Sequence, residues 1–224
     1  MTDVLVRAKD LGRQFGDAQD GVVAVANATF TIRRGDRIAL VGPSGSGKTT
    51  LLHLIAGLDQ PSAGVIEWPA LGRAEDLRPG PVAVAFQGPS LLPPLTVAEN
   101  VALPALLAGC APAAAAADAA AMIERLGLSD IASKLPEEIS GGQAQRAGVA
   151  RALAGKPRLI LADEPTGQLD RGSALQLMDV LLRQAEATDA ALVVATHDAA
   201  VAGRLPLRWT MNGRVLETEP ACTL

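Results

Sequence analysis

The segment Gly42-Pro-Ser-Gly-Ser-Gly-Lys48-Thr49 constrains the fold of this chain more than any other feature of its sequence. It matches the pattern G-x-x-x-x-G-K-[ST] at every fixed position, and this pattern is meaningful only between a strand and a helix. The sequence supplies both neighbours. The apolar run Arg37–Val41 comes before the segment and predicts a strand buried on both faces. The leucine spacing from Thr49 to Leu58 predicts a helix that ends at Gly57.

The residue types in this loop suit contact with phosphate. Glycines let backbone N–H groups converge on phosphate oxygens, and the helix N-terminus adds the positive end of its dipole. Lys48 is expected to reach the β- and γ-phosphates, and the hydroxyl of Thr49 is expected to ligate Mg²⁺. We therefore predict that ATP is bound by the residues from the first glycine to the second threonine, namely Gly42, Pro43, Ser44, Gly45, Ser46, Gly47, Lys48, Thr49 and Thr50.

Strand and helix patterns alternate along the rest of the chain. We expect short N-terminal strands, a helical stretch from residue 88 to 154, and a closing hairpin around Asn212-Gly213. This order predicts an α/β fold in which a parallel sheet is interrupted by a helical insert. The predicted strands are Val4–Arg7, Ala24–Ala26, Ala28–Ile32, Val82–Phe86, Arg158–Ala162 and Ala191–Ala195, with a helix at Ser173–Ala187.

Composition limits the classes of function. The hydrophobic content of 49 % is sufficient for a proper core. A net charge of −4 argues against a nucleic-acid-binding surface, which needs clustered positive charge. No stretch reaches roughly 18 strongly apolar residues, so a separate partner is expected to supply any membrane span. Cys110 and Cys222 lack metal-binding spacing and are interpreted as ordinary thiols.

Two acidic residues end the predicted strand Arg158–Ala162. A carboxylate at the end of a strand beside the phosphate loop, here Asp163, is suited to hold Mg²⁺. The adjacent Glu164 is suited to orient and deprotonate the attacking water. Many strands end in acids simply because acids are well solvated, so this motif gains its meaning from the phosphate loop.

His197 follows the predicted strand Ala191–Ala195 and is one of two histidines. At a strand end in such a sheet it is placed to touch the γ-phosphate and fix the attacking water. A lone histidine is more often an ordinary surface residue, and both interpretations stand at this point. His53, the other histidine, is interpreted as structural.

The segment Ser140-Gly-Gly-Gln143 suggests a second anion-binding helix N-terminus. Ser140 is a predicted N-cap, followed by two flexible residues and a helix over Gln145–Leu153. Since the phosphate loop already holds one nucleotide, a second cradle suggests a second copy of the protein. A simple capped helix is the alternative interpretation, and the residues alone leave both open.

In this order, the phosphate loop, Gln87, Ser140-Gly-Gly-Gln143, Asp163-Glu164, Asp170 and His197 resemble the nucleotide-binding subunit of ATP-binding cassette (ABC) transporters. The resemblance covers essentially the whole chain. It implies a P-loop NTPase fold of the α/β class with a parallel-sheet core, an N-terminal antiparallel β subdomain and an inserted helical subdomain. The implied single domain spans 1–224, with 1–87 and 155–224 forming the core and β subdomain and 88–154 the helical subdomain.

The resemblance also implies roles for individual residues. Two subunits pair head to tail, and each ATP lies between one phosphate loop and the partner copy's signature segment, Ser140, Gly141, Gly142 and Gln143. Gln87 contacts Mg²⁺ and the attacking water. Asp170 lies near the partner copy's active site. Phe15 stacks on adenine, in a position where Tyr is common in the family.

Partners and location follow from the same resemblance. An integral-membrane permease holds the subunit at the cytoplasmic face of the inner membrane, and the proline-rich stretch Gly88–Leu107 is the expected dock for it. Ala162-Asp-Glu-Pro-Thr-Gly167 and similar stretches resemble the branch of macrolide exporters, lipoprotein-releasing ATPases and the cell-division ATPase. Three positions depart from that pattern, namely Thr49 for Ser, Gln168 for Asn, and Ala144 for a long polar residue.

Two other functions remain to be weighed. A mechanotransmission ATPase drives a membrane partner without transporting a substrate, and the sequence does not separate it from a transporter. A soluble ABC ATPase that acts on DNA or ribosomes is disfavoured, because such proteins usually carry two cassettes or long insertions and this chain has 224 residues with an acidic balance.

Overall fold

The computed structural model of the chain describes residues 3–16, 20–88 and 90–218. Cys222, and Pro89 within the proline-rich stretch, lie outside these ranges. Within the described residues one mixed sheet has the order β4-β1-β2-β9-β8-β3-β7-β6-β5. Its strands are β1 (Val4–Phe15), β2 (Val22–Arg33), β3 (Arg37–Val41), β4 (Ala63–Glu67), β5 (Val82–Ala85), β6 (Leu159–Asp163), β7 (Ala191–Thr196), β8 (Leu207–Asn212) and β9 (Val215–Thr218). The α-helices are α1 (Lys48–Ile55), α2 (Val97–Leu107), α3 (Pro112–Arg125), α4 (Gly141–Ala154), α5 (Arg171–Thr188) and α6 (Ala199–Ala202).

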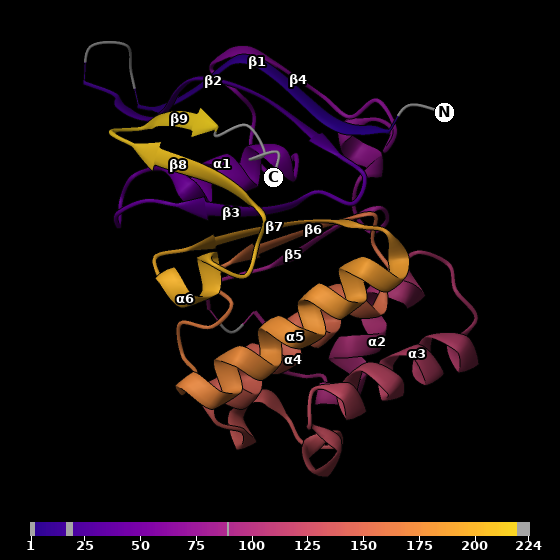
Figure 1. The fold of residues 1–224 in the computed structure, drawn as a ribbon. Coiled ribbons are helices and arrows are strands. Elements are labelled where there is room, and N and C mark those ends of the chain that lie inside the picture. Colours follow the sequence, from indigo (N-terminus) through magenta and orange to yellow (C-terminus); the bar gives the residue numbers. More distant parts are fainter. Residues whose placement is uncertain (1–2, 17–19, 89, 219–224) are drawn as a thin grey trace.

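The strands β8, β3, β7, β6 and β5 run parallel and form the predicted parallel core. Alternate residues of these strands enter two separate cores. On β7, Leu192 and Val194 pack with the helices α2 to α5, whereas Val193 and Ala195 pack with α1. Figure 1 shows α1 on one side of the parallel strands, toward β1 and β2, and α4 and α5 on the other. Burial on both faces explains why these strands are continuous apolar runs.

The antiparallel strands are longer than the sequence predicted. β1 and β2 each have 12 residues, so Ala24–Ala26 and Ala28–Ile32 belong to one strand, and Val4–Arg7 is only the start of another. Asp10 and Asn27 adopt positive φ angles of 51° and 48° where the register of the β1–β2 pair shifts. These residues therefore form β-bulges inside continuous strands, where the sequence suggested breaks.

The edge strand β4 and the short helix α6 were not predicted. The residues of β4 are exposed or half-buried, so they carry little apolar alternation to reveal a strand. The closing hairpin around Asn212-Gly213 was predicted correctly, because β8 and β9 pair antiparallel there, in the middle of the sheet. β9 also joins the two parts of the sheet through the pairing of Ala26 with Val215.

The helices α2, α3 and α4 pack together over the end of the sheet that carries β5 (Figure 1). The prediction that α4 starts at Gln145 was wrong, because it starts at Gly141, directly after its N-cap Ser140. Ser140 and Gln143 form a reciprocal capping box that satisfies the two free N–H groups there. This favourable cap lets both glycines enter the first turn. No helix in the described parts of the chain is long and apolar enough to cross a bilayer.

Candidate nucleotide site

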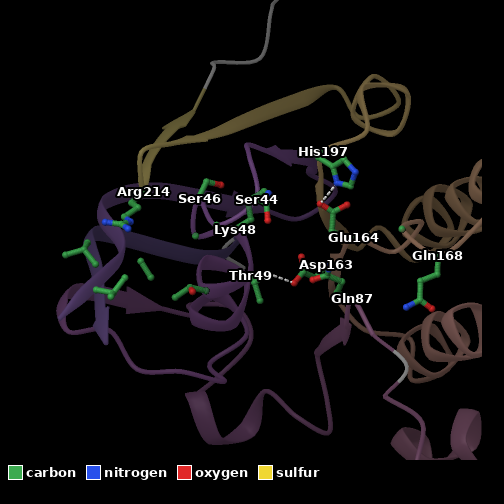
Figure 2. A pocket seen from close by; sticks show the side chains of 17 residues that line it. Ser44, Ser46, Lys48, Thr49, Gln87, Asp163, Glu164, Gln168, His197 and Arg214 are labelled. Atoms are coloured by element: carbon green, nitrogen blue, oxygen red, sulfur yellow. Dashed lines mark hydrogen bonds and ion pairs between the residues drawn. The ribbon is translucent and has the colours of Figure 1, made fainter. Parts of the chain in front are cut away.

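A cavity of about 610 Å³ opens where the parallel strands β3, β6 and β7 end. Carboxyl ends of parallel strands meet along one edge of a sheet, which is why residues distant in sequence gather here. Figure 2 shows these side chains converging from both sides of the pocket. The lining residues are Val22, Val23, Ala24, Ser44, Gly45, Ser46, Gly47, Lys48, Thr49, Thr50, Gln87, Asp163, Glu164, Gly167, Gln168, His197 and Arg214.

The phosphate loop wraps around the ammonium group of Lys48. Lys48 Nζ donates hydrogen bonds to the carbonyl oxygens of Gly42 and Pro43, at 2.8 and 3.0 Å. Ser46 is buried, and its Oγ has no hydrogen-bond partner among the described residues. A buried hydroxyl without a partner costs free energy, and a phosphate oxygen in the loop would supply the partner.

Gly47 lets the loop pass close to the neighbouring strand. Its φ angle is 103°, and a Cβ atom there would lie 2.0 Å from the carbonyl oxygen of Ala24. The segment of β2 that contains Ala24 also lines the cavity. A glycine is therefore required for both the backbone conformation and the space.

We expect Gly47→Ala to lower the free energy of unfolding by about 3 kcal/mol, through backbone strain and displacement of the Ala24 strand. Gly45→Ala is the matched control, because Gly45 also has a positive φ angle, 75°, but open space around its Cβ position. The control should cost only about 1–2 kcal/mol, from the left-handed conformation alone. Denaturant unfolding compares the two, and equal losses would contradict the role of the close approach to Ala24.

Two pairs of side chains meet at the other end of the loop (Figure 2). Thr49 Oγ1 donates a hydrogen bond of 2.7 Å to Asp163 Oδ2, and His197 Nδ1 lies 2.9 Å from Glu164 Oε1. Burial raises the pKa of Asp163, and the hydrogen bond from Thr49 opposes that rise. The four residues come from α1, the ends of β6 and β7, and the loops that follow.

The backbone of Glu164 adopts a conformation that is unusual for its residue type. Its φ angle is 45°, while its N–H donates to the carbonyl oxygen of Ala195 at 2.9 Å. The side chain is only 11 % exposed, and the imidazole of His197 beside it is 73 % exposed. Left-handed backbone at a non-glycine residue costs about 1–3 kcal/mol and persists only where the surroundings fix it. The fold thus holds the Glu164 carboxylate at one place on the cavity wall.

The structure leaves other predicted site residues outside the cavity lining. The signature segment Ser140–Gln143 lies elsewhere, at the start of α4, where its Gln143 side chain completes the capping box. Cβ atoms on Gly141 and Gly142 would come within 3.1 Å of Gln168 Oε1 and 3.2 Å of Leu169 Cδ2. The two glycines therefore let α4 approach the loop that carries Gln168, which does line the cavity.

Asp170 and Phe15 also lie outside the lining. The carboxylate of Asp170 caps α5 by accepting from the N–H groups of Gly172 and Ser173, and from the hydroxyl of Ser173, whose bond lowers the pKa of Asp170. Phe15 pairs across the β1–β2 ladder with Val22, which lines the cavity. Gly42 and Pro43 contribute carbonyl oxygens to Lys48 rather than a surface to this cavity.

Sequence reasoning missed several lining residues, notably Val22, Val23, Ala24 and Arg214. The first three belong to a strand predicted to begin at Ala24, and nothing in their composition marks a ligand contact. Arg214 lies in the β8–β9 turn, and its carbonyl oxygen accepts a 2.9 Å hydrogen bond from Ala26 N–H. Only the pairing of β2 with β9 brings these segments together, and that pairing has no local sequence signal.

Known proteins are similar in sequence to most of this chain. The family model described as ABC transporter matches residues 25–167. The lipoprotein-releasing system ATP-binding protein LolD of Legionella pneumophila (strain Paris) is 39 % identical over 212 residues, covering 92 % of this chain and 93 % of the relative. LolD of Gluconobacter oxydans (strain 621H) is 41 % identical over 214 residues, with the same coverage.

Solved structures agree with the fold. The ATP-binding cassette MJ0796, in a dimeric post-hydrolysis state bound to ADP and Pi, superposes with a TM-score of 0.90 at 30 % identity. The superposition covers 98 % of this chain and 100 % of that one. It confirms the predicted P-loop NTPase fold with its mixed sheet and helices. With the phosphate loop, its acidic partners and these relatives together, the chain belongs to the ABC transporter family, as an ATP-binding and ATP-hydrolysing subunit.

Proposed function

We propose that this subunit powers a lipoprotein-releasing system, in which two copies attach to a membrane permease and close around ATP. The supporting observation is similarity along the whole chain to proteins named as the ATP-binding component of such systems. They include relatives from Legionella, Shewanella and Gluconobacter at 37–41 % identity, each covering at least 92 % of this chain. The permease would hold the subunit at the cytoplasmic face of the inner membrane.

The phosphate loop is suited to hold the triphosphate of ATP. Lys48 has its ammonium group at the loop, and the unpartnered Ser46 hydroxyl is available to a phosphate oxygen. In the proposed complex, backbone N–H groups of residues 44–50 surround the phosphates. Lys48 then turns from its two carbonyl acceptors toward the β- and γ-phosphates, where its charge is worth more.

Thr49 and Asp163 fit Mg²⁺. Their oxygen atoms lie 2.7 Å apart, and hydroxyl, carboxylate and amide oxygens are the ligands that Mg²⁺ prefers. Gln87 lines the same cavity and would add an amide oxygen. When bound, Mg²⁺ neutralises charge on the phosphate oxygens. An ion bound there would favour the ionised form of Asp163, whereas burial raises the pKa of Asp163 and favours the protonated form.

We expect Asp163→Asn to raise the free energy of unfolding of the nucleotide-free chain by about 1 kcal/mol near neutral pH, since a buried charge is replaced by a neutral amide. Because the pKa of Asp163 is raised in the folded chain, there is a pH range in which the folded chain keeps the carboxyl proton of Asp163 and the unfolded chain has lost it. Stability of the parent therefore falls as pH rises through that pKa, and the variant's advantage should shrink in acid.

The matched control for this prediction is Asp130→Asn, at an exposed aspartate. Its free energy of unfolding should stay within about 0.5 kcal/mol of the parent. Denaturant unfolding at several pH values gives both quantities. A loss of stability in Asp163→Asn near neutral pH would contradict the account of a costly buried carboxylate.

Glu164 is proposed as the base that takes a proton from the attacking water. Its carboxylate stands on the cavity wall beside Asp163, with His197 2.9 Å away at Nδ1. An ionised carboxylate only accepts hydrogen bonds, so the imidazole donates from Nδ1 and orients it. The exposed remainder of the imidazole is then available to the γ-phosphate and the water. Water attacks in line as the leaving ADP departs.

A second copy would complete the site. In one chain the signature segment Ser140–Gln143 does not line the cavity, although it exposes a capped helix N-terminus. In a head-to-tail pair, the partner copy's segment would cover the γ-phosphate, and Asp170 would lie near the junction. The dimeric state of the cassette at 30 % identity supports this arrangement. ATP then favours closure, because it contacts both copies only in the closed pair.

The permease would dock beside the edge strand β5. A groove of about 700 Å³ runs there between β5, the C-terminal part of α2 and the C-terminal part of α4. Leu103, Pro104 and Leu107 line it, all within the proline-rich stretch that the sequence suggested as the dock. Its apolar character suits an amphipathic helix from the cytoplasmic side of the permease.

The proposed function is tested by reconstituting the chain in vesicles with the membrane subunits of a lipoprotein-releasing system. Vesicles would contain a lipid-modified lipoprotein, and its release into the soluble fraction would be followed after addition of ATP. With ATP, we expect release of the lipoprotein by the parent chain and no release by Glu164→Gln. When ATP is omitted, the parent chain should release none either. Vesicles that hydrolyse ATP at the permease-stimulated rate but release no lipoprotein would contradict the proposal.

A further inference from the structure

Phe15 lies against the side chain of Arg13 on the same strand. The guanidinium carbon of Arg13 is 4.4 Å from the centroid of the Phe15 ring. This is the distance of a cation stacked on an aromatic face. Phe15 itself is 43 % exposed, which is high for a phenylalanine on a strand. One face of the ring is therefore supported by Arg13, and the exposed part remains accessible.

Arg13 is fixed by contacts on its far side. Its Nε donates a 2.8 Å hydrogen bond to Asp59 Oδ2, and its Nη1 lies 3.4 Å from Ser62 Oγ. The side chains of Arg13 and Asp59 are only 24 % and 22 % exposed, so the ion pair is partly shielded from water. A guanidinium held by a carboxylate keeps its plane and its position better than a free one.

The partner Asp59 connects this contact to the phosphate loop. It follows directly on the turn after α1, the helix that begins at Lys48. Two further hydrogen bonds join the same segments. Ser62 N–H donates to the carbonyl oxygen of Gly12 at 2.8 Å, and the side-chain Oγ of Ser62 accepts from Gln14 N–H at 3.1 Å. The end of β1 is thus fastened to the segment that leaves the phosphate-loop helix.

We propose that Arg13 is a positioning residue for nucleotide binding: held by Asp59 and Ser62, its guanidinium supports one face of Phe15 so that the other face receives adenine. The inference rests on the stacking of adenine on Phe15 that the family resemblance implies, within the proposed ATP-binding function. A ring that is already oriented loses less conformational entropy when the base arrives. A planar guanidinium is needed, because a lysine ammonium pairs with Asp59 but does not stack on the ring in the same way.

Charge attraction is the competing explanation for any effect of Arg13, because a cation near the site would draw in any phosphate compound. Two comparisons separate the explanations. Arg13→Lys keeps the charge and loses the planar stack. Pyrophosphate carries phosphate charge without a base, so a residue that acts through Phe15 should not change its binding.

The experiment measures ADP and pyrophosphate binding to the full chain by titration calorimetry. ADP is chosen because it avoids ATP-driven closure of two copies. For ADP, we expect Phe15→Ala to raise Kd by roughly tenfold or more, and both Arg13→Ala and Arg13→Lys to raise it about three- to fivefold. The double variant Arg13→Ala/Phe15→Ala should bind ADP no more weakly than Phe15→Ala. Pyrophosphate affinity should be unchanged in all of them.

Arg7→Ala is the matched control, an exposed arginine on the same strand, and should match the parent. Asp59→Asn should give a smaller loss of ADP affinity than Arg13→Ala. It can be used to test the role of Arg13 if Arg13→Ala folds poorly. If Phe15→Ala binds ADP like the parent, the stacking role itself is wrong. If Phe15→Ala weakens binding but Arg13→Ala and Arg13→Lys do not, only the role of Arg13 is wrong. If pyrophosphate binds more weakly to Arg13→Ala but normally to Arg13→Lys, Arg13 acts through charge attraction and not by positioning Phe15.

Discussion

Replacing Glu164 by Gln is expected to reduce ATP turnover by about a thousandfold while ATP binding is retained. A glutamine has nearly the same shape and can still pair with His197, but it cannot take a proton from water. A positioned general base contributes on the order of 10²–10⁴-fold to rate. The measurement is steady-state phosphate release at saturating ATP, beside nucleotide affinity for the same preparation.

Glu186→Gln is the matched control for this change, at an exposed glutamate on α5. It should hydrolyse ATP at the parent rate. A Glu164→Gln variant that keeps more than about a tenth of parent turnover would remove Glu164 from the role of base. A variant that loses ATP binding as well would instead show that the carboxylate maintains the shape of the cavity.

Lys48→Ala has the second large expected effect, on binding as well as on turnover. In the nucleotide-free chain the Lys48 ammonium is held by the carbonyl oxygens of Gly42 and Pro43, ready to meet phosphate. Without it, the charge on the β- and γ-phosphates loses its direct partner. Removing one such electrostatic contact from a shielded site costs about 10²–10³-fold in rate. We expect ATP affinity to fall at least about tenfold in addition.

The control for Lys48→Ala is Lys156→Ala, which removes an exposed lysine paired with Asp118 at 2.8 Å. Surface ion pairs contribute about 0–1 kcal/mol, so this variant should fold and turn over ATP like the parent. Circular dichroism and thermal unfolding would show whether Lys48→Ala keeps its fold. Normal ATP binding by a folded Lys48→Ala chain would contradict the proposed role of the loop.

Much of the parallel core was predictable because its signals are local. The runs at β3, β6 and β7 are apolar on both faces, and each is followed by residues suited to binding or catalysis. These are the glycine-rich loop after β3, two acidic residues at the end of β6 and a histidine after β7. Parallel strands bring their carboxyl ends to one edge, so Lys48, Asp163, Glu164 and His197 could be grouped before their distances were known. The structure places all four around one cavity.

Other features depend on long-range pairing and could not be predicted. The bulges at Asp10 and Asn27 depend on the register between β1 and β2. In the sequence, these polar residues inside the strands look like the ends of strands. Arg214 reaches the cavity only because β9 joins β2. The Arg13–Asp59 pair spans 46 positions and connects two segments whose approach no local pattern reveals.

The first residues of α4 show the limit within a single element. Two adjacent glycines lower helix propensity, so the sequence suggested a delayed start. The reciprocal bonds between Ser140 and Gln143 offset that cost, and Gly141 and Gly142 gain close packing against Gln168 and Leu169. Capping and packing together therefore override the local preference.

In the proposed pair of subunits, ATP binds between the phosphate loop of one copy and the signature segment of another. Light scattering of the Glu164→Gln chain with and without ATP and Mg²⁺, beside Glu164→Gln/Ser140→Arg, measures whether that pair forms. We expect an ATP-dependent dimer for the first chain, and a monomer that still binds ATP for the second, because the arginine obstructs the segment. A Glu164→Gln chain that stays monomeric when saturated with ATP, or a dimer unaffected by Ser140→Arg, would rule out this arrangement.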